Sequence, residues 1–487
     1  MRNYIVMAAV AASLGLPLAA QAQVEVREGN PPATATAVQT PSEALQTQRR
    51  VRVIVTLEDP AESGGNLSPR EIRALQDAVI ESVFDTTASA MESGSNPYGL
   101  SRLTVVPAFA VNVDEAELRR LQSDPRVENV ALDMELDAFL TQSTKIIGMP
   151  AAWKAPYRAT GDGETVAIVD TGVNLNHKFL DDSRIIGQAC FSGAGNPAAS
   201  FCPNGTTRQT GGNSGKNCPT KFAAGCVHGT HVAGIAAGYN TNPKDGEPLE
   251  GVAFDANIVA VQVFKKTKDD DGNDAIDTSF SDIFVALDWL YRNRNKFETP
   301  LTSINMSLGG GGPFTTNCDQ DPLGRVMKVM IRRFRRADVA VVIASGNDGF
   351  TDGVAMPACV SNAITVGATT KWTFGQEERT AYYSNMGRMV DVLAPGGDAF
   401  YPVDTPYVST ILSSVPGNKF KGLQGTSMAA PHVAGVFAAI RSADKCGGKS
   451  VAAIEKALEK TGKKITDVNY TRRRVNLPRA MRRLGCN

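Results

Sequence analysis

The chain is organised around Gly425-Thr426-Ser427-Met428-Ala429-Ala430-Pro431-His432-Val433-Ala434-Gly435. A loop ends there at a small hydroxyl residue and runs into a helix built from small residues. Ser427 is expected at the junction, where a helix N-terminus supplies unpaired N–H groups and the positive end of a dipole. Such a serine can hold a nucleophile against a substrate, or it can be an ordinary helix cap. The rest of the chain has to decide between these two interpretations.

Length and composition bound the answer. The chain has 487 residues, so two or three structural units are expected, and its 42% hydrophobic content is enough for a large core. Lysine plus arginine and aspartate plus glutamate each number 50. This balance gives no indication of a nucleic acid or an anionic membrane as partner. We expect a monomer that binds neither.

The N-terminus has the features of a signal peptide over residues 1–22. A short basic start precedes an alanine-rich apolar run, and Ala20-Gln21-Ala22 has the small-x-small form of a cleavage site. The alternative is an N-terminal anchor. No later stretch is apolar for long enough to span a bilayer. We therefore expect a protein exported to the extracellular space or the periplasm, with no membrane attachment after signal removal.

The cysteine content fits export. The eight cysteines are even in number and none belongs to a C-x-x-C pair, so disulfides are favoured over a zinc site. Sequence does not determine connectivity, and pairing between neighbours is only a guess. The residues are Cys190, Cys202, Cys218, Cys226, Cys318, Cys359, Cys446 and Cys486, and the guessed pairs are 190–226, 202–218, 318–359 and 446–486.

Two regions precede the main part of the chain. Residues 23–47 are rich in Pro, Thr, Ala and Gln without periodicity and are predicted to be a disordered spacer. Residues 48–138 are predicted to form a small α+β unit of order β-α-β-β-α-β that carries no catalytic constellation. Its expected strands are 50–57, 103–106, 108–113 and 127–132, its expected helices are 69–91 and 115–123, and 133–144 is expected to be irregular.

The remainder, 139–487, alternates strands and helices. Continuous apolar strands with intervening helices predict an α/β fold, with a parallel sheet covered on both faces. The expected strands are 166–169, 257–264, 302–306, 339–344, 363–366 and 389–393, and the expected helices are 229–238, 281–293, 322–337, 426–443 and 451–460. Sites in such sheets gather at the carboxyl ends of strands, where Asp170, Ser307 and Asn347 are expected.

Histidines are the candidates for a general base near neutral pH. The chain has four, and His228 and His231 are three residues apart in one predicted helix. A metal pair is conceivable, although the spacing is not that of His-Glu-x-x-His and no acidic third ligand is near in sequence. The favoured interpretation is one base that opens a helix and one histidine that packs on it. His177 and His432 are expected to be structural.

The strand-end residues admit functional interpretations too. Asp170-Thr171-Gly172 can orient a histidine, or be one arm of an aspartic-protease dyad, but the chain has no second such turn. The carboxamide of Asn347 can donate to an oxyanion. The glycine-rich run 305–312 can let a peptide backbone lie close and leave a pocket open. Each of these segments alone could also be an ordinary turn.

Together the residues resemble the subtilisin-like serine proteases, or subtilases. The four motifs stand in the family's order: Val169-Asp170-Thr171-Gly172, His228-Gly229-Thr230-His231-Val232-Ala233-Gly234, Ala344-Ser345-Gly346-Asn347 and Gly425-Thr426-Ser427-Met428-Ala429-Ala430-Pro431-His432. The resemblance covers about residues 145–480. The 48–138 unit resembles the inhibitory prosegment that precedes many such proteases. The resemblance implies a subtilisin-like α/β domain after a small α+β prodomain.

The resemblance also implies roles. Ser427 would be the nucleophile, His228 its base and Asp170 the residue that orients the histidine. The side chain of Asn347 and the backbone N–H of Ser427 would bind the oxyanion. Substrate would pair as an added strand with Ser307-Leu308-Gly309, and the pocket for the residue before the cut would be lined by Ala344, Ser345 and Gly346. The resemblance therefore implies that the protein is a secreted serine endopeptidase, which is inhibited by its own propeptide and self-processed within about residues 137–145.

Several features remain open. Asp170 and His228 are 228 − 170 = 58 positions apart, and 188–226 is interpreted as a disulfide-tied insertion that shapes the cleft rim or binds a partner.

The chemistry requires no cofactor. Structural calcium is conceivable in the acidic loop 269–274, which can equally be a solvated loop, and no metal ligand is assigned. Glycines suggest a roomy pocket for apolar or aromatic residues. The alternatives to a serine peptidase are a non-catalytic binding protein and a metal-dependent hydrolase.

Overall fold

The computed structural model of the protein describes residues 40–486 except 47, 59–66, 85, 92–97, 134, 139–142, 241–249, 371–377 and 399–409. The predicted signal peptide and most of the predicted spacer lie outside the described residues. The spacer prediction is wrong at its C-terminal end, where α1 (Pro41–Ala44) forms. The Thr40 hydroxyl accepts from the backbone N–H of Glu43, and the Glu43 carboxylate accepts from the N–H of Thr40. This capping box and a proline in the first turn are helix-start signals.

The 48–138 region contains a four-stranded antiparallel sheet of order β2-β3-β1-β4. Its elements are β1 (Val51–Leu57), α2 (Pro69–Val83), α3 (Ala88–Met91), β2 (Ser101–Arg102), β3 (Ala108–Val113), α4 (Glu115–Ser123) and β4 (Val127–Leu132). The predicted helix 69–91 is interrupted, because Phe84 takes an extended conformation and packs edge-on against Tyr98. The strand predicted at 103–106 lies earlier, at 101–102.

Strand β1 is buried on both faces. Val53 and Val55 pack with α2 and α4 in the core of the small unit. Ile54, from the opposite face, belongs to the same apolar cluster as Phe284 and Met330 of the large region. Arg52 also points to that second face. The small sheet therefore shares a core with the large region. Successive apolar residues of β1 alternate between two buried clusters, one on each face of the strand.

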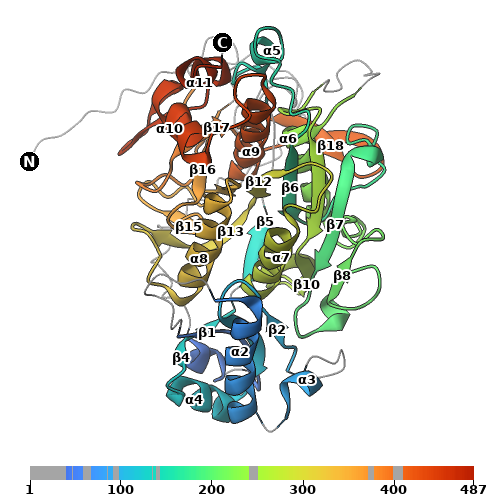
Figure 1. Ribbon diagram of the computed structural model, residues 1–487, viewed down its shortest axis with the longest axis vertical. Helices are drawn as coiled ribbons and strands as arrows, with labels where there is room; N and C mark the ends of the chain where they lie inside the picture. Colours follow the sequence, from blue (N-terminus) through green and yellow to red (C-terminus); the bar gives the residue numbers. More distant parts are fainter. Residues whose placement is uncertain are drawn as a thin grey trace, which may run out of the picture. The chain divides into compact units, whose positions relative to one another are not determined.

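The large region is built on a ten-stranded sheet of order β20-β21-β17-β16-β14-β12-β6-β9-β7-β8 (Figure 1). The strands from β21 to β7 in this order are parallel to their neighbours, and β20 and β8 are antiparallel at the two edges. Their bounds are β6 (Thr165–Asp170), β7 (Ile185–Phe191), β8 (Arg208–Thr210), β9 (Asn257–Gln262), β12 (Leu301–Met306), β14 (Ala340–Ala344), β16 (Ile364–Thr369), β17 (Val392–Pro395), β20 (Lys463–Thr466) and β21 (Thr471–Arg474). The predicted parallel sheet is confirmed.

Helices cover both faces of this sheet. One apolar cluster joins the sheet to α5 (Met149–Ala152), α6 (His228–Ala237), α9 (Thr426–Ser442), α10 (Val451–Thr461) and α11 (Leu477–Leu484). The other joins it to α7 (Phe280–Asn293) and α8 (Pro322–Arg336). Among the described helices, none has both the length and the apolar content needed to cross a membrane.

Smaller sheets complete the region. A five-stranded sheet has the order β10-β11-β5-β13-β15, and β18 and β19 form a two-stranded sheet. Their bounds are β5 (Glu135–Ala138), β10 (Phe264–Lys268), β11 (Asp274–Ser279), β13 (Leu308–Phe314), β15 (Val354–Met356), β18 (Ile411–Val415) and β19 (Lys419–Leu423). The irregular stretch predicted over 133–144 therefore contains a strand, β5.

All eight cysteines form disulfides, and two of the four guessed pairs are wrong. The guesses 318–359 and 446–486 are confirmed, but the other bonds join Cys190 to Cys202 and Cys218 to Cys226. Cys202 lies 12 residues after Cys190, on the turn that returns the chain to form β8 beside β7, so Cys190 meets Cys202. The insertion predicted over 188–226 also begins inside the central sheet, because β7 pairs in parallel with β9.

Candidate active site

Asp170 and His228 form a buried pair at the edge of the central sheet. Asp170 is the last residue of β6, and His228 is the first residue of α6. The imidazole Nδ1 lies 2.7 Å from Oδ1 and 2.8 Å from Oδ2 of Asp170, and both side chains are at most 1% exposed. Since Nδ1–H donates to the carboxylate, Nε2 carries the lone pair. Nε2 is buried and has no hydrogen-bond partner among the described residues.

Small residues allow this close approach. A Cβ at Gly229 would come within 2.2 Å of the carbonyl oxygen of Gly172 and 3.1 Å of Oδ1 of Asp170. Any larger residue after His228 would therefore push α6 away from the end of β6. The N–H of Gly229 donates to the hydroxyl of Thr171, at 2.8 Å. This contact ties the first turn of α6 to the loop that follows the aspartate.

Ser427 is the second residue of α9, as expected for a loop-to-helix junction. Its Oγ–H donates to the carbonyl of Ser307, at 3.1 Å, and the Ser307 hydroxyl donates to the Ser427 carbonyl, at 2.5 Å. Pro431, which lies inside α9, has no N–H to offer the Ser427 carbonyl four residues earlier. The Ser307 hydroxyl fills that vacancy and fixes the turn of helix that carries Ser427.

Small residues also let α9 pack deeply against α6. A Cβ at Gly435 would come within 2.8 Å of the carbonyl oxygen of Ala236. The two helices that begin at His228 and at Thr426 therefore pack against each other with little space between their backbones. Ser307 follows β12, and β12 is the direct neighbour of β6. The structure thus gathers Asp170, Ser307 and Asn347 at the carboxyl ends of the adjacent parallel strands β6, β12 and β14.

Asn347 is held by the residue that precedes the serine. Its Oδ1 accepts from both the backbone N–H and the hydroxyl of Thr426, each at 2.8 Å. With Oδ1 engaged twice, the Nδ2 group is the part of the amide that can donate elsewhere. Sequence reasoning assigned no role to Thr426. Its signal was present in the hydroxyl at the start of the helix, but only the structure shows that it reaches Asn347.

A strand of the chain itself lies against the predicted substrate-binding segment. β5 pairs antiparallel with β13, with Ala138 opposite Leu308 and Asp137 opposite Gly309. β5 also pairs with β11 on its other side. The backbone of 135–138 is therefore a strand inserted between β11 and β13. An extended peptide that adds to the edge of a sheet uses the same backbone hydrogen bonds. Ser307 immediately precedes this ladder.

The predicted pocket residues lie together at the end of β14. Ala344, Ser345 and Gly346 are buried at the end of β14. A Cβ at Gly346 would meet the amide of Asn385 at 2.3 Å and the methyl of Ala355 at 3.0 Å. Gly309 approaches the same methyl, at 3.6 Å from its would-be Cβ. Ala355 and Asn385 are thus pocket neighbours that the sequence reasoning missed, because neither belongs to a recognised motif.

The other histidines make structural contacts. Nε2 of His231 lies 2.9 Å from the Lys421 carbonyl, and Nε2 of His177 lies 3.0 Å from the Lys419 carbonyl. These bonds link the start of α6 and the loop after β6 to β19. His432 bridges the Met428 carbonyl, at 2.7 Å, and the N–H of Ser143, at 2.8 Å. Burial lowers the pKa of His231 to about 3 and that of His432 to about 4.

The buried histidines predict a loss of stability in acid. His432 stays neutral in the folded chain down to about pH 4, whereas an unfolded histidine takes up a proton near pH 6.5. The unfolded state therefore binds more protons between these values, and His432 alone lowers the free energy of unfolding by about 3 kcal/mol as the pH falls from 6.5 to 4. Urea unfolding at several pH values, in a Ser427→Ala background, measures this. His432→Gln should flatten the decline, and an unchanged slope would contradict the assignment.

In the acidic loop proposed for calcium, Asp269 and Asp274 bond to other residues of the same turn. Asp269 accepts from the N–H of Asp271, at 3.1 Å, and from the N–H of Asn273, at 2.7 Å. Lys268 pairs with Asp274 at 2.6 Å. These contacts close the turn between β10 and β11 and engage the carboxylates of Asp269 and Asp274. A second group, Asp391, Glu455 and Glu459, brings carboxylate oxygens within 4.8 Å of one another.

Comparisons with known proteins agree with this geometry. The subtilase family matches residues 161–476. An extracellular protease of Xanthomonas campestris pv. campestris is 31% identical over 73% of this chain and 59% of its own length. An extracellular serine proteinase of Thermus sp. is 33% identical over 68% of this chain and 65% of its own length. A solved structure of proteases from Pseudoalteromonas arctica has a TM-score of 0.51 at 27% identity, covering 70% of this chain and 94% of that one.

The fold and the family match lead to the same class. The parallel sheet and the segments at its carboxyl edge lie within the match to the subtilase family over residues 161–476. The chain belongs to the subtilase family. It spans less than two thirds of the length of the first two relatives named above.

Proposed function

We propose that the protein is a secreted serine endopeptidase that cleaves proteins or peptides with Ser427, His228 and Asp170. One observation carries this proposal: a buried His228–Asp170 pair leaves Nε2 without a partner, beside the helix whose second residue is Ser427. A buried nitrogen without a hydrogen-bond partner costs free energy, so its presence calls for an explanation. Acceptance of the serine proton would be that explanation. Hydrolysis of a peptide substrate by the processed enzyme tests the proposal.

The proposed reaction uses each contact of the site. Ser427 Oγ–H turns from the Ser307 carbonyl toward Nε2 of His228 and attacks the scissile carbonyl as its proton passes to the imidazole. Asp170 keeps the proton of Nδ1 in place and stabilises the imidazolium. The imidazolium then protonates the leaving amine, and an acyl-enzyme remains on Ser427. Water, activated by the same imidazole, hydrolyses the acyl-enzyme and restores the serine.

The amide of Asn347 is proposed as an oxyanion donor. Thr426 holds Oδ1, so that Nδ2 can donate to the developing charge together with the backbone N–H of Ser427. We expect Asn347→Ala to lower kcat by about 10²–10³-fold with little change in KM, because the interaction strengthens only in the transition state. Steady-state kinetics on a peptide substrate measure this. A comparable rise in KM with unchanged kcat would assign Asn347 to ground-state binding instead.

The 48–138 region is proposed to be an inhibitory propeptide, and 139–487 the peptidase region. The strand pairing of β5 with β13 supports this, because the propeptide's last strand then covers the segment that substrate needs. The chain would be exported by its signal peptide as an inactive precursor. Cleavage by its own Ser427 would follow, and later loss of the propeptide would open the cleft.

The self-cleaved bond is expected between Ala138 and Ser143. Antiparallel pairing directs the chain from Ala138 toward Ser307, whose carbonyl accepts from Ser427. Ser143, at the other end of this interval, donates its backbone N–H to His432, which lies in the same helix as Ser427. N-terminal sequencing of the mature enzyme should find a first residue within 139–143. A mature N-terminus outside this interval would show that β5 does not lie in the productive register.

Substrate preference is proposed to favour apolar or aromatic residues before the cut. The small residues Gly309, Gly346 and Ala355 lie close together and support this proposal. Structural calcium stays a proposal without assigned ligands. The proposed chemistry needs no metal, because the proton acceptor and the oxyanion donors are all groups of the protein.

A further inference from the structure

The disulfide-tied loop between Cys190 and Cys202, here called the 190–202 loop, touches the propeptide region backbone to backbone. A Cβ at Gly99 would lie 2.2 Å from Cα and 2.9 Å from N of Gly195. No contact between residues that carry side chains could be this close. The two glycines come from opposite sides of the bond that self-cleavage would break, so they remain together after processing only through non-covalent contacts.

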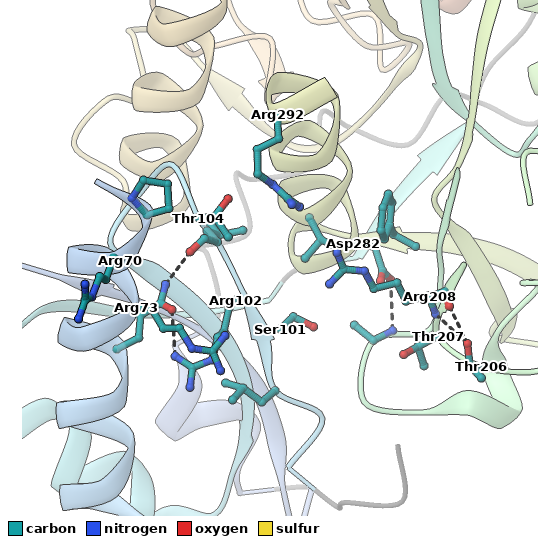
Figure 2. A pocket seen from close by; sticks show the side chains of 17 residues that line it. Arg70, Arg73, Ser101, Arg102, Thr104, Thr206, Thr207, Arg208, Asp282 and Arg292 are labelled. Atoms are coloured by element: carbon teal, nitrogen blue, oxygen red, sulfur yellow. Dashed lines mark hydrogen bonds between the residues drawn. The ribbon is translucent and has the colours of Figure 1, made fainter. Parts of the chain in front are cut away.

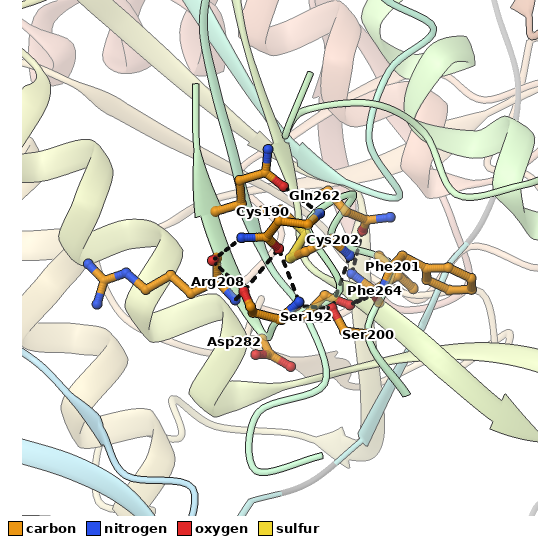
Figure 3. Close-up of a disulfide and its surroundings, with 12 residues drawn as sticks. Cys190, Ser192, Ser200, Phe201, Cys202, Arg208, Gln262, Phe264 and Asp282 are labelled. Atoms are coloured by element: carbon orange, nitrogen blue, oxygen red, sulfur yellow. Dashed lines mark hydrogen bonds between the residues drawn. A yellow bond between two sulfur atoms is a disulfide. The ribbon is translucent and has the colours of Figure 1, made fainter. Parts of the chain in front are cut away.

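The 190–202 loop is rigid in ways that do not depend on the propeptide. Besides the disulfide, the Ser192 hydroxyl donates to the Phe264 carbonyl, at 2.5 Å, and accepts from the N–H of Phe201, at 2.9 Å (Figure 3). At the tip, the N–H of Asn196 donates to the Gly193 carbonyl, at 2.7 Å. Gly195 there has a φ of +77°, which favours glycine in a tight turn. The enzyme therefore presents a preformed tip.

That tip closes over a buried guanidinium of the propeptide. A Cβ at Gly195 would meet Nη1 of Arg52 at 3.1 Å and Nδ2 of Asn112 at 2.5 Å. Arg52 donates to the Gly99 carbonyl, at 2.8 Å, and to the Ser281 hydroxyl, at 2.9 Å, and it pairs with Asp133 at 3.2 Å. These bonds hold the guanidinium and leave it little freedom to yield to a larger residue at position 195.

Beside the tip, the two regions enclose a cavity of about 710 Å³ instead of packing tightly. Its arginines come from both sides, Arg70, Arg73 and Arg102 from the propeptide region and Arg208 and Arg292 from the enzyme (Figure 2). Burial, and then the charge of Arg292, lower the pKa of Arg208. Arg102 is paired with Asp77 and Arg292 with Asp288, each within its own region. Because these charges already have partners on their own side, the shape of the glycine contact is the feature expected to give selectivity.

We propose that the 190–202 loop is a recognition surface for this enzyme's own propeptide, which it selects by the absence of a side chain at position 99. The inference rests on the proposed function of 48–138 as a propeptide. It assigns a role to the first half of the 188–226 insertion. The loop would set how tightly the cleaved propeptide stays bound and how soon the enzyme becomes active, without taking part in the chemistry.

The test compares glycine-to-alanine variants that differ in what the new methyl meets. The self-processed complex is purified and diluted, and the concentration dependence of initial peptidase activity gives the Kd of the propeptide. Gly99→Ala should raise this Kd by about tenfold or more, because its Cβ meets backbone that cannot move aside. Gly195→Ala should raise it to a smaller extent, because its closest contact is the side-chain amide of Asn112 rather than backbone.

Gly205→Ala is the matched control. Gly205 also lies in the insertion at positive φ, +74°, but its Cβ would have nothing within 4 Å. This control carries the same backbone strain and should leave the Kd within about twofold of the wild type. The kcat/KM of the fully released Gly195→Ala enzyme should equal that of the wild type. Equal Kd values for Gly99→Ala, Gly195→Ala and Gly205→Ala would overturn the proposal.

A second readout separates this proposal from the proposed function. In the uncleaved Ser427→Ala chain, hydrogen exchange needs no activity. Gly99→Ala should speed exchange at residues 98–113 and 192–201, whereas Gly205→Ala should not. If the wild type hydrolyses no peptide, the proposed function fails, but this exchange pattern still decides whether the loop recognises the 48–138 region. Unchanged exchange in Gly99→Ala would reject that recognition whatever the activity.

Discussion

Ser427→Ala is expected to lower kcat by about 10⁶-fold, the size of effect that loss of the nucleophile has in subtilisin. The same variant should accumulate as the unprocessed chain after export, because the proposed self-cleavage uses the same hydroxyl. Its fold should persist, since the Ser427 carbonyl, not the hydroxyl, receives the Ser307 bond that holds this turn of α9. Peptidase assays and the mass of the secreted chain measure both effects.

A matched control for this variant is Ser413→Ala. Ser413 is also buried, and its hydroxyl donates to the His231 carbonyl at 2.9 Å, so its loss weakens packing on α6 without removing a proposed reacting group. Activity within about tenfold of the wild type is expected for this control. Normal processing of Ser427→Ala would contradict self-cleavage. Retained hydrolysis would contradict the nucleophile assignment itself.

Asp170→Asn is expected to lower kcat by about 10⁴-fold, while the protein remains folded. The carboxylate lies within 2.8 Å of Nδ1 with both oxygens and also accepts from the N–H of Thr171, at 2.7 Å. An amide that turns its oxygen to Thr171 would present N–H groups to the imidazole. His228 would then carry its proton on Nε2, where it could no longer accept one from Ser427.

Kinetics together with thermal unfolding separate a catalytic loss from a folding defect in this variant. Asp181→Asn is the matched control, because this aspartate accepts only local bonds from Ser183 in the described structure, at 3.1 and 2.8 Å. Its kcat should be unchanged. An Asp170→Asn enzyme that keeps more than a tenth of wild-type activity would show that His228 does not depend on the buried carboxylate.

Sequence patterns were sufficient where residues carry their own local signal. The apolar runs ending at Asp170 and at Met306 predict buried strands, and both end at the site edge as expected. Helices α4 and α7 form where a capping residue precedes an amphipathic pattern, at Asp114 and at Ser279. The fold class and the family followed from such signals and are confirmed.

Features that depend on partners far along the chain were not predictable in this way. β5 is a strand because β11 and β13 flank it, and its short sequence gives no independent strand signal. The pattern of residues 50–57 predicts a strand but gives no indication that Arg52 contacts Asp133 and Ser281. The two wrong disulfide guesses have the same cause, because the chain reversal between β7 and β8 brings Cys190 to Cys202.

The candidate site shows the same difference between residues that carry a local signal and contacts that depend on distant parts of the chain. The motifs identified Asp170, His228, Asn347 and Ser427 as candidates, but not the groups that hold them. Thr426 reaches Asn347 only because α9 begins beside the end of β14. The hydroxyl of Ser307 reaches the Ser427 carbonyl because Pro431 leaves that carbonyl without a helix partner. These supports depend on side-chain geometry between elements.

The most direct test of the account is the labelling of the processed enzyme with an organophosphonate fluorophore, followed by mass spectrometry of the labelled peptide. Such a probe reacts with a serine only when a base activates it and donors stabilise the anionic intermediate. The account predicts one adduct, on Ser427, that is absent from Ser427→Ala. A folded and processed wild type that stays unlabelled, or that carries the adduct on another serine, would contradict it.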